Sequence, residues 1–370
     1  MNGKQLQQAA RRTAEALPGP LPHLAHGTAL TPAQWKEGTT VSRTMRAIVL
    51  THPVDPDQLT VSDVPVPEQR PGWVRIRIKA FGVNESETTS RKGGSSRDFT
   101  MPRILGIEGV GIVDAAPVDS GLKPGQKVAT MMGGMGRAYD GSYAEYTLVP
   151  LGQVIPFETD LPWDVVGALP EMFQTAYGSL TTGLDLKPGQ RLLIRGGTST
   201  VGLSAAALAK DLGATVLSTT RRPERARTLR EHGVDHPIID DGKIADRVRE
   251  LSPDGVDAAL ELVGGPALPD TLRAVRRGGT ACFTGSLADQ WVIPDFNPFA
   301  VIPIGVRLTV YAGGAADLPP AAFEHQLGSI AEGRLKPGIA KVYHGLDQVP
   351  LAHADLDAGR TPGKHVVVLD

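Results

Sequence analysis

A run of glycine, serine and threonine residues follows a short apolar stretch near the middle of the chain. Residues 191–195 predict a buried strand, residues 196–202 a tight turn, and residues 203–212 an apolar helix. Small residues let backbone N–H groups approach a phosphate, and the positive end of the following helix favours its negative charge. The turn therefore predicts a dinucleotide site. The expected pyrophosphate contacts are Thr198, Ser199, Thr200 and Val201.

The next predicted strand, residues 214–219, ends in hydroxyl and guanidinium side chains. An acidic residue at this point would bind the ribose 2′-hydroxyl of NAD. The chain instead carries Thr219, Thr220, Arg221 and Arg222. Because an arginine fork suits a 2′-phosphate, the predicted cofactor is NADPH. A solvated helix start is the alternative interpretation of these arginines. Asp240 and Asp241 also end a predicted strand, but one strand–helix unit later.

The elements that must position this turn fall into two patterns. Residues 73–80 alternate strictly between apolar and charged side chains, which indicates a half-buried strand. Further short strands with turn signals between them predict a partly closed β domain. After residue 163 strands and helices alternate, which predicts a Rossmann-type, doubly wound parallel sheet in an α/β fold. Residues 341–343 and 365–369 return to β character.

We therefore expect three parts in the chain. Residues 1–44 form an N-terminal extension that packs on the surface or stays mobile. Residues 45–162 and 328–370 form a substrate-binding β domain, into which an NADPH-binding Rossmann domain, residues 163–327, is inserted. A chain of 370 residues exceeds the size at which single cores stop growing, so a division into domains is expected.

Composition narrows the class of partner. The formal net charge of −2 gives no global field for nucleic acid or an anionic membrane, and no apolar run reaches the roughly 18 residues of a membrane-spanning helix. Cys282 is the sole cysteine, so neither an internal disulfide nor a cysteine-rich zinc site can form. We expect a cytoplasmic protein whose partner is a small-molecule substrate.

The order of these parts resembles the medium-chain dehydrogenase/reductase superfamily. Within it, the chain resembles the zinc-independent quinone oxidoreductases, the relatives of zeta-crystallin. The resemblance covers about residues 45–370 and implies a GroES-like β domain with the Rossmann domain inserted. It rests on residues 81–84, 104–111, 141–146, 168–171, 175–177, 196–202 and 363–364.

The resemblance also bears on the metal. Zinc-dependent members place cysteine, histidine or acidic ligands at three positions, which here hold Asn84, Ile107 and Glu171. Isoleucine cannot ligate and an amide is a poor zinc ligand, so we expect no metal.

Several roles follow from the resemblance alone. It implies that Asn84 lies beside the nicotinamide, where it could donate to a developing oxyanion or merely cap a turn. Glu171 could supply a proton if its pKa were raised, or could cap the next helix. The remaining implied cofactor contacts are Thr175, Gly264, Gly285 and, near the phosphates, Lys364.

The expected reaction is NADPH-dependent, metal-free hydride transfer to a quinone or an activated, α,β-unsaturated carbonyl compound. An enoyl-thioester or biosynthetic-intermediate reductase, and a non-catalytic NADPH-binding structural or regulatory protein, remain as alternatives. Residues 306–311 resemble the edge strand that pairs across a two-fold axis in this superfamily, so a homodimer is expected.

Overall fold

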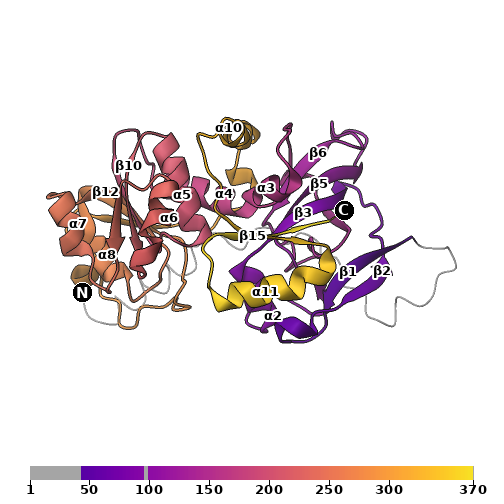
Figure 1. Ribbon diagram of the computed structural model, residues 1–370, viewed down its shortest axis with the longest axis horizontal. Helices are drawn as coiled ribbons and strands as arrows, with labels where there is room; N and C mark the ends of the chain where they lie inside the picture. The colour runs from indigo at the N-terminus through magenta and orange to yellow at the C-terminus, as the bar shows by residue number, and fades with distance from the viewer. Residues whose placement is uncertain (1–42, 96–98, 370) are drawn as a thin grey trace, which may run out of the picture. The chain divides into compact units, whose positions relative to one another are not determined.

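The computed structural model describes residues 43–95 and 99–369. The predicted N-terminal extension, residues 1–44, lies almost wholly outside the described residues, as does residue 370 at the end of the predicted β domain. The described strands form three sheets, two of them in the predicted β domain and one in the predicted Rossmann domain (Figure 1). Within the described residues, no helix combines the length and the apolar character needed to cross a membrane.

A small antiparallel sheet has the order β2-β1-β4. Its strands are β1 (Thr44–Leu50), β2 (Val61–Pro65) and β4 (Arg103–Ile104). A larger sheet has the order β15-β16-β3-β5-β6-β8, and β7 also pairs with β3. Its strands are β3 (Trp73–Val83), β5 (Glu108–Ala115), β6 (Lys127–Met131), β7 (Tyr146–Pro150), β8 (Val154–Pro156), β15 (Ile339–His344) and β16 (Lys364–Val368).

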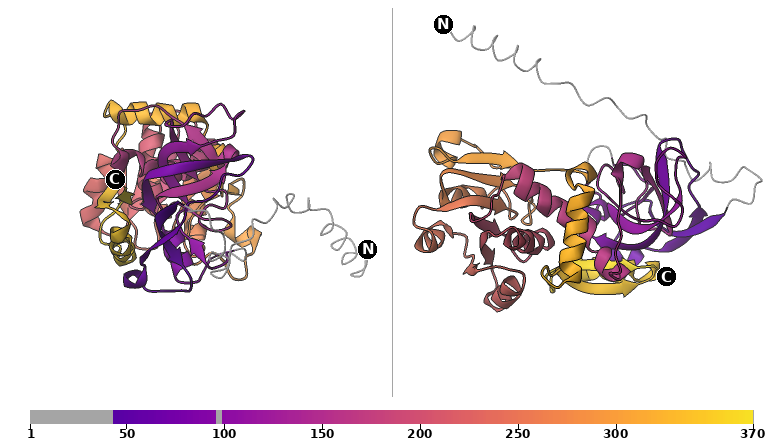
Figure 2. Two further views of the ribbon diagram at one scale, coloured as in Figure 1. Left: turned by 90° about the vertical axis from the view of Figure 1, so that its right-hand side faces the viewer. Right: turned by 90° about the horizontal axis from the view of Figure 1, so that it is seen from above.

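The alternation of residues 73–80 explains the position of β3. Val74, Ile76 and Ile78 are buried in one core, whereas the charged residues between them are more exposed. The C-terminal strand β16 pairs antiparallel with β3, with Val366 opposite Gly82. Figures 1 and 2 therefore show the yellow end of the chain beside the indigo strands of its beginning. The expected return of the chain to the β domain is confirmed.

Helices and short helical turns connect these strands. They are η1 (Pro56–Gln58), α2 (Glu85–Arg91), η2 (Leu151–Gln153), α3 (Trp163–Val166), α4 (Leu169–Gly178), the π-helical turn η3 (Ser179–Gly183), η5 (Ala315–Asp317), α10 (Pro320–Ala331), η6 (Leu346–Gln348) and α11 (Val349–Ala358). Among them, α2 and α4 carry the predicted residues Asn84 and Glu171 at their N-terminal ends.

The third sheet is wholly parallel and has the order β11-β10-β9-β12-β13-β14. Its strands are β9 (Arg191–Arg195), β10 (Thr215–Thr220), β11 (His236–Ile239), β12 (Val256–Glu261), β13 (Val275–Phe283) and β14 (Arg307–Val310). The helices of this part are α5 (Thr200–Asp211), η4 (Pro223–Arg225), α6 (Ala226–Glu231), α7 (Ala245–Leu251), α8 (Leu268–Ala274) and α9 (Pro298–Val301).

Successive residues of β9 face opposite sides of this sheet, and both sides are buried. Leu192 and Ile194 pack in a core with residues of α5, whereas Leu193 packs in a second core with residues of α7 and α8. A strand covered on both faces must be apolar throughout, which is why residues 192–194 lack alternation. The predicted α/β class, with a GroES-like β domain and a Rossmann-type sheet, is confirmed.

Candidate active site

The turn after β9 approaches its neighbours too closely for any side chain at two of its positions. A Cβ on Gly197 would lie 1.8 Å from Ser218 Oγ, and a Cβ on Gly202 would lie 2.7 Å from Gly196 O. Gly196 itself has a φ of +88°, in the left-handed region that favours glycine. The glycines therefore let the chain fold tightly from β9 into α5, which exposes the N-terminal N–H groups of that helix to a ligand.

The hydroxyl of Ser199 is used inside this turn. Ser199 Oγ accepts a hydrogen bond from Gly202 N at 3.1 Å, as an N-cap, and donates to Gly196 O at 2.8 Å. The Ser199 hydroxyl is thus engaged within the turn, and the predicted contact of this residue with the pyrophosphate would come from its backbone. Thr198, Thr200 and Val201 are partly exposed around the first turn of α5.

The end of β10 supports the turn. Thr219 is buried, its Oγ1 accepts from Gly196 N at 3.1 Å, and its carbonyl accepts from Gly197 N at 3.0 Å. Thr220 is also buried, and its Oγ1 accepts from Arg222 N at 3.2 Å. These two hydroxyls were predicted to bind the cofactor directly. In the structure both hydroxyls bond to protein groups and shape the two loops, and a contact of Thr219 or Thr220 with the cofactor stays a prediction.

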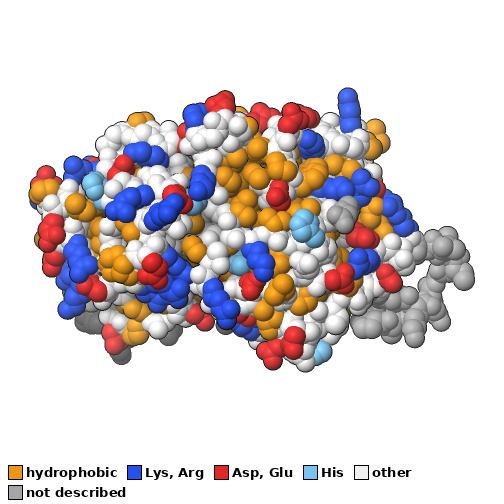
Figure 3. All heavy atoms as spheres, in the orientation of Figure 1, with side chains coloured by type: hydrophobic (Ala, Val, Ile, Leu, Met, Phe, Trp, Pro, Cys, Tyr) orange, Lys and Arg blue, Asp and Glu red, His pale blue; other side chains and the backbone are white. Residues whose placement is uncertain are grey.

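Three arginines follow Thr220. Arg221 and Arg222 are exposed, whereas Arg225 is half-buried and donates to the carbonyls of Gly359 and Arg360 at 3.1 and 2.9 Å. Burial lowers the pKa of Arg225, and the positive charges of Arg222 and Arg221 lower it further. The cluster therefore concentrates positive charge, and Figure 3 shows Lys and Arg side chains over the region of α6.

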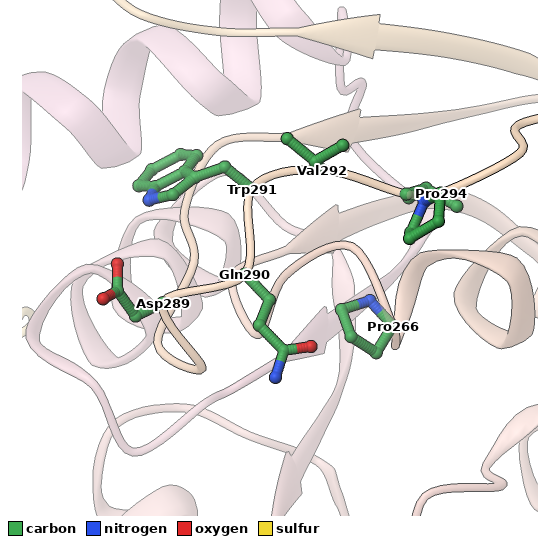
Figure 4. A pocket seen from close by; sticks show the side chains of 7 residues that line it. Pro266, Asp289, Gln290, Trp291, Val292 and Pro294 are labelled. Carbon is green, nitrogen blue, oxygen red and sulfur yellow. The ribbon is translucent and has the colours of Figure 1, made fainter.

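The carboxyl ends of β12 and β13 lie at the same edge of the sheet as the turn. Gly264 has a φ of +130°, and its N–H donates to Glu261 Oε1 at 3.1 Å. Gly285 follows β13 and donates to Glu261 O at 3.3 Å. A cavity of about 560 Å³ opens beside Gly264, between Pro266 and residues 289–294 (Figure 4). The predicted residues Gly264 and Gly285 thus border the edge that the turn occupies.

A second, buried cluster centres on the ammonium group of Lys364. Lys364 Nζ donates to Asn84 Oδ1, lies 2.6 Å from Glu108 Oε1 and donates to Glu171 Oε2 at 3.0 Å. The side chains of Lys364 and Glu108 are wholly buried, and both carboxylates raise the pKa of Lys364 against the effect of burial. All three donors of Lys364 are engaged by these partners, and its position near the cofactor phosphates stays a prediction.

Both ends of the Asn84 amide are engaged in the same cluster. Its Oδ1 accepts from Lys364, and its Nδ2 donates to Glu108 Oε1 at 3.0 Å and more weakly to Glu87 Oε1 at 3.4 Å. Donation by Asn84 to an oxyanion would require one of these bonds to break. Its backbone N–H donates to Glu87 Oε2 at 3.1 Å at the start of α2, so the side chain that caps this helix start is that of Glu87, while the Asn84 amide is engaged by the cluster.

Glu171 lies where this cluster reaches solvent. Its side chain is 13% exposed, its Oε2 accepts from Lys364, and its Oε1 accepts from Thr175 Oγ1 at 3.1 Å. Its backbone N–H donates to Glu108 Oε2 at 2.8 Å. The structure therefore brings the predicted residues Asn84, Glu171, Thr175 and Lys364 together around Glu108.

Glu87 adds a third carboxyl to the cluster. It is 1% exposed, and burial raises its pKa to about 7, although the N–H of Ile107 donates to it at 2.8 Å. Burial also raises the pKa of Glu108. With three carboxyl groups and one ammonium group, the cluster retains a proton on Glu87 over much of the acidic range.

These residues do not fit a catalytic zinc ion. Ile107 offers an apolar side chain, Asn84 turns its oxygen to Lys364, and the fixed charge of that ammonium group would repel a metal cation. Across residues 43–95 and 99–369, no group of three His, Cys, Asp or Glu side chains has the geometry of a metal site.

Sequence reasoning missed the residues that organise both clusters. Glu87 and Glu108 hold Asn84 and Lys364, and Arg195 pairs with Asp240 behind the turn at 2.9 Å. The available signals were a charged residue ending the apolar stretch 192–194, and the spacing of Asn84 and Glu87, which is that of a capping box.

Comparison with protein families decides the class of protein. The alcohol dehydrogenase GroES-like domain matches residues 70–159, and the zinc-binding dehydrogenase family matches residues 200–325. The chain belongs to the medium-chain dehydrogenase/reductase superfamily. It is an oxidoreductase whose relatives include quinone oxidoreductases, so the resemblance drawn from the motifs is confirmed.

Within this superfamily, quinone oxidoreductase from Lama guanicoe is 28% identical over 335 residues, which cover 89% of this chain and 99% of the relative. A mycobacterial protein solved in complex with NADPH is 27% identical, with a TM-score of 0.74 over 88% of this chain and 99% of its own. A 2-haloacrylate reductase is 25% identical, with a TM-score of 0.76 over 87% of this chain and 99% of its own.

Proposed function

We propose that this oxidoreductase uses NADPH to reduce a quinone or an α,β-unsaturated carbonyl compound without a metal ion. The observation that carries the metal-free part is the Lys364 ammonium group among Asn84, Glu108 and Glu171. Carbonyl–alcohol interconversion benefits from a Lewis acid on the oxygen. Quinones and enones spread the incoming charge over a conjugated system, so orientation in a dry pocket supplies more of the catalysis.

The cofactor would supply the hydride, and the residues around it would bind and orient. The N–H groups of Thr200 and Val201 begin α5 and are suited to the pyrophosphate. Arg221 and Arg222 are suited to the 2′-phosphate, because both are exposed beside the turn. Relatives named for quinone and 2-haloacrylate reduction, and a relative solved with NADPH, support this assignment.

In this proposal Asn84 is a positioning residue and Glu171 the catalytic carboxylate. Asn84 joins α2 to Glu108 and Lys364, which fixes the wall of the site. Glu171 keeps one face exposed while Lys364 and Thr175 hold its two oxygens. It is thereby oriented to order the water that protonates the product. Glu171→Gln should lower kcat more than it raises the KM for NADPH.

The cofactor assignment is tested by titration with NADPH and NADH. Arg221→Ala should weaken NADPH binding about tenfold, the size of one charge-assisted contact, and leave NADH binding unchanged. Arg227→Ala is the matched control, since Arg227 is exposed on α6 and pairs with Glu231 at 2.9 Å. Equal losses for both cofactors would remove Arg221 from the 2′-phosphate site.

The reaction is tested by following NADPH absorbance with 1,4-benzoquinone, 9,10-phenanthrenequinone and a set of enones and enoyl thioesters. Turnover with quinones or simple enones supports the proposal, and turnover with thioesters alone supports the enoyl-thioester alternative. Tight NADPH binding without turnover across the whole set would contradict it and support a non-catalytic protein.

We also propose a homodimer formed through β14, which is the last strand of the parallel sheet. Val310 is 75% exposed on this strand, and Phe299 on nearby α9 is fully exposed. Among the described strands none pairs with the outer edge of β14, and such an edge beside apolar side chains favours pairing with a second chain. Light scattering should give a mass twice that of one chain, which is 39.1 kDa. A single species of 39.1 kDa would refute the dimer.

A further inference from the structure

Arg195 is a buried arginine at the carboxyl end of β9, directly before the turn. It is 1% exposed and donates to both oxygens of Asp240, at 2.9 and 3.0 Å. Its third nitrogen donates to Asp270 Oδ2 at 3.1 Å and to Ala267 O at 2.9 Å. All three nitrogens thus face protein groups, so Arg195 does not itself offer a free guanidinium group to a ligand.

Asp240 lies beside the arginine cluster. Strands β10 and β11 are parallel with Thr220 opposite Ile239, and Asp240 N donates to Thr220 O at 2.9 Å. The next residues along the two strands, Arg221 and Asp240, are therefore neighbours at the edge of the sheet. The acidic residue that binds a ribose hydroxyl in this fold ends the strand after the turn, here β10. Asp240 ends the neighbouring strand β11 instead, and a negative charge there would oppose a 2′-phosphate bound beside it.

The fork of Arg195 covers this carboxylate. The Asp240 side chain is 9% exposed, and the bidentate pair holds the pKa of Asp240 below its ordinary value in spite of burial. Asp240 Oδ2 also accepts from Thr219 Oγ1 at 3.3 Å, which in turn accepts from Gly196 N. The pair is therefore built into the support of the turn and cannot swing away independently.

Two further carboxylates lie near Arg195 but have other partners. Asp270 accepts from Ile244 N at 2.7 Å and from Arg273 at 2.9 Å. Glu261 accepts from Thr271 Oγ1 at 2.5 Å and from the N–H groups of the loop after β12. Asp240 is thus the member of this group that borders β10 and depends on Arg195 for its neutralisation.

We propose that Arg195 determines the cofactor preference by neutralising Asp240, so that a 2′-phosphate can bind at Arg221 and Arg222. The inference rests on the proposed NADPH function. Without Arg195, the Asp240 carboxylate would face the phosphate as an uncompensated charge. At about 10 Å and an effective dielectric constant of about 20, one such charge changes affinity roughly tenfold.

The test compares binding of 2′,5′-ADP and 5′-AMP, which differ only in the 2′-phosphate, by isothermal titration calorimetry. Wild type should bind 2′,5′-ADP more tightly. Arg195→Met should lower this preference about tenfold, Asp240→Asn should raise it, and the double variant should return it to within about threefold of wild type. Arg247→Met is the matched control. It removes the partner of Asp241, the residue after Asp240, whose Oδ2 lies 2.9 Å from Arg247 Nη2 in an exposed ion pair.

Each outcome decides one of the two ideas. A wild type that does not distinguish the ligands contradicts the NADPH assignment, whatever Arg195 does. A wild type that prefers 2′,5′-ADP, with the preference intact in folded Arg195→Met, overturns the role of Arg195. If Arg195→Met does not fold, the Asp240→Asn variant provides the test. A preference of Asp240→Asn for 2′,5′-ADP that is no greater than that of wild type also overturns the role of Arg195.

Discussion

The raised pKa of Glu87 predicts a measurable dependence of stability on pH. Its carboxyl ionises near pH 4.5 in the unfolded chain and near 7 in the folded protein. Between these values the unfolded chain has released the proton and the folded protein keeps it, so the free energy of unfolding falls as the pH rises. At about 1.4 kcal/mol per pH unit, the loss reaches about 3 kcal/mol by pH 7.

Glu87→Gln removes this titration and resembles the protonated carboxyl. Urea unfolding of wild type and variant from pH 4 to pH 8 should show the variant gaining about 3 kcal/mol relative to wild type, nearly all of it between pH 4.5 and 7. Glu85→Gln is the matched control, since Glu85 is exposed on the same helix. If the curves of Glu87→Gln and wild type run parallel, Glu87 is ionised in the folded protein and the account of the cluster is wrong.

Three further predictions concern the cluster around Lys364, the turn after β9 and the absence of a metal ion. Lys364→Met should destabilise the protein by about 3–5 kcal/mol in urea unfolding, because two carboxylates lose their cation, and adding Glu108→Gln should recover part of the loss. Gly197→Ala should abolish cofactor-induced thermal stabilisation, whereas Gly152→Ala, which meets nothing within 4 Å, should keep it. Dialysis against EDTA should leave turnover and thermal stability unchanged; loss of activity that zinc restores would contradict the metal-free proposal.

Much of the fold could be predicted because it rests on local patterns. The alternation of residues 73–80 predicted part of β3 (Trp73–Val83), and the apolar stretch before the glycines predicted β9. By contrast, β13 (Val275–Phe283) begins in a stretch with no apolar pattern of its own. Its first half contains two arginines and two glycines, residues 276–279, which interrupt the pairing with β12 between Val275 and Thr280. An irregularity of this kind depends on the neighbouring strand and leaves no period in the sequence.

The candidate site was less predictable, because its partners come from distant segments. The motifs indicated Asn84, Glu171 and Lys364 one by one, but Glu108 joins them only when β3, β5, α4 and β16 have come together. Likewise, Thr219 was predicted to contact the ligand from its position at a strand end. Its hydroxyl supports Gly196 instead, which depends on the path of the turn.

The position of β16 has a consequence for how the protein comes to be folded. This strand lies between β15 and β3 inside its sheet, and its first residue, Lys364, contacts Asn84 from 280 positions along the chain. During synthesis, one edge of β3 stays without its partner strand until the ribosome has released the chain as far as Val368. The parallel sheet, whose strands all lie within residues 191–310, has no such delay. We therefore expect nascent chains to gain a folded Rossmann sheet first, and the buried ammonium–carboxylate cluster to be among the last features to form.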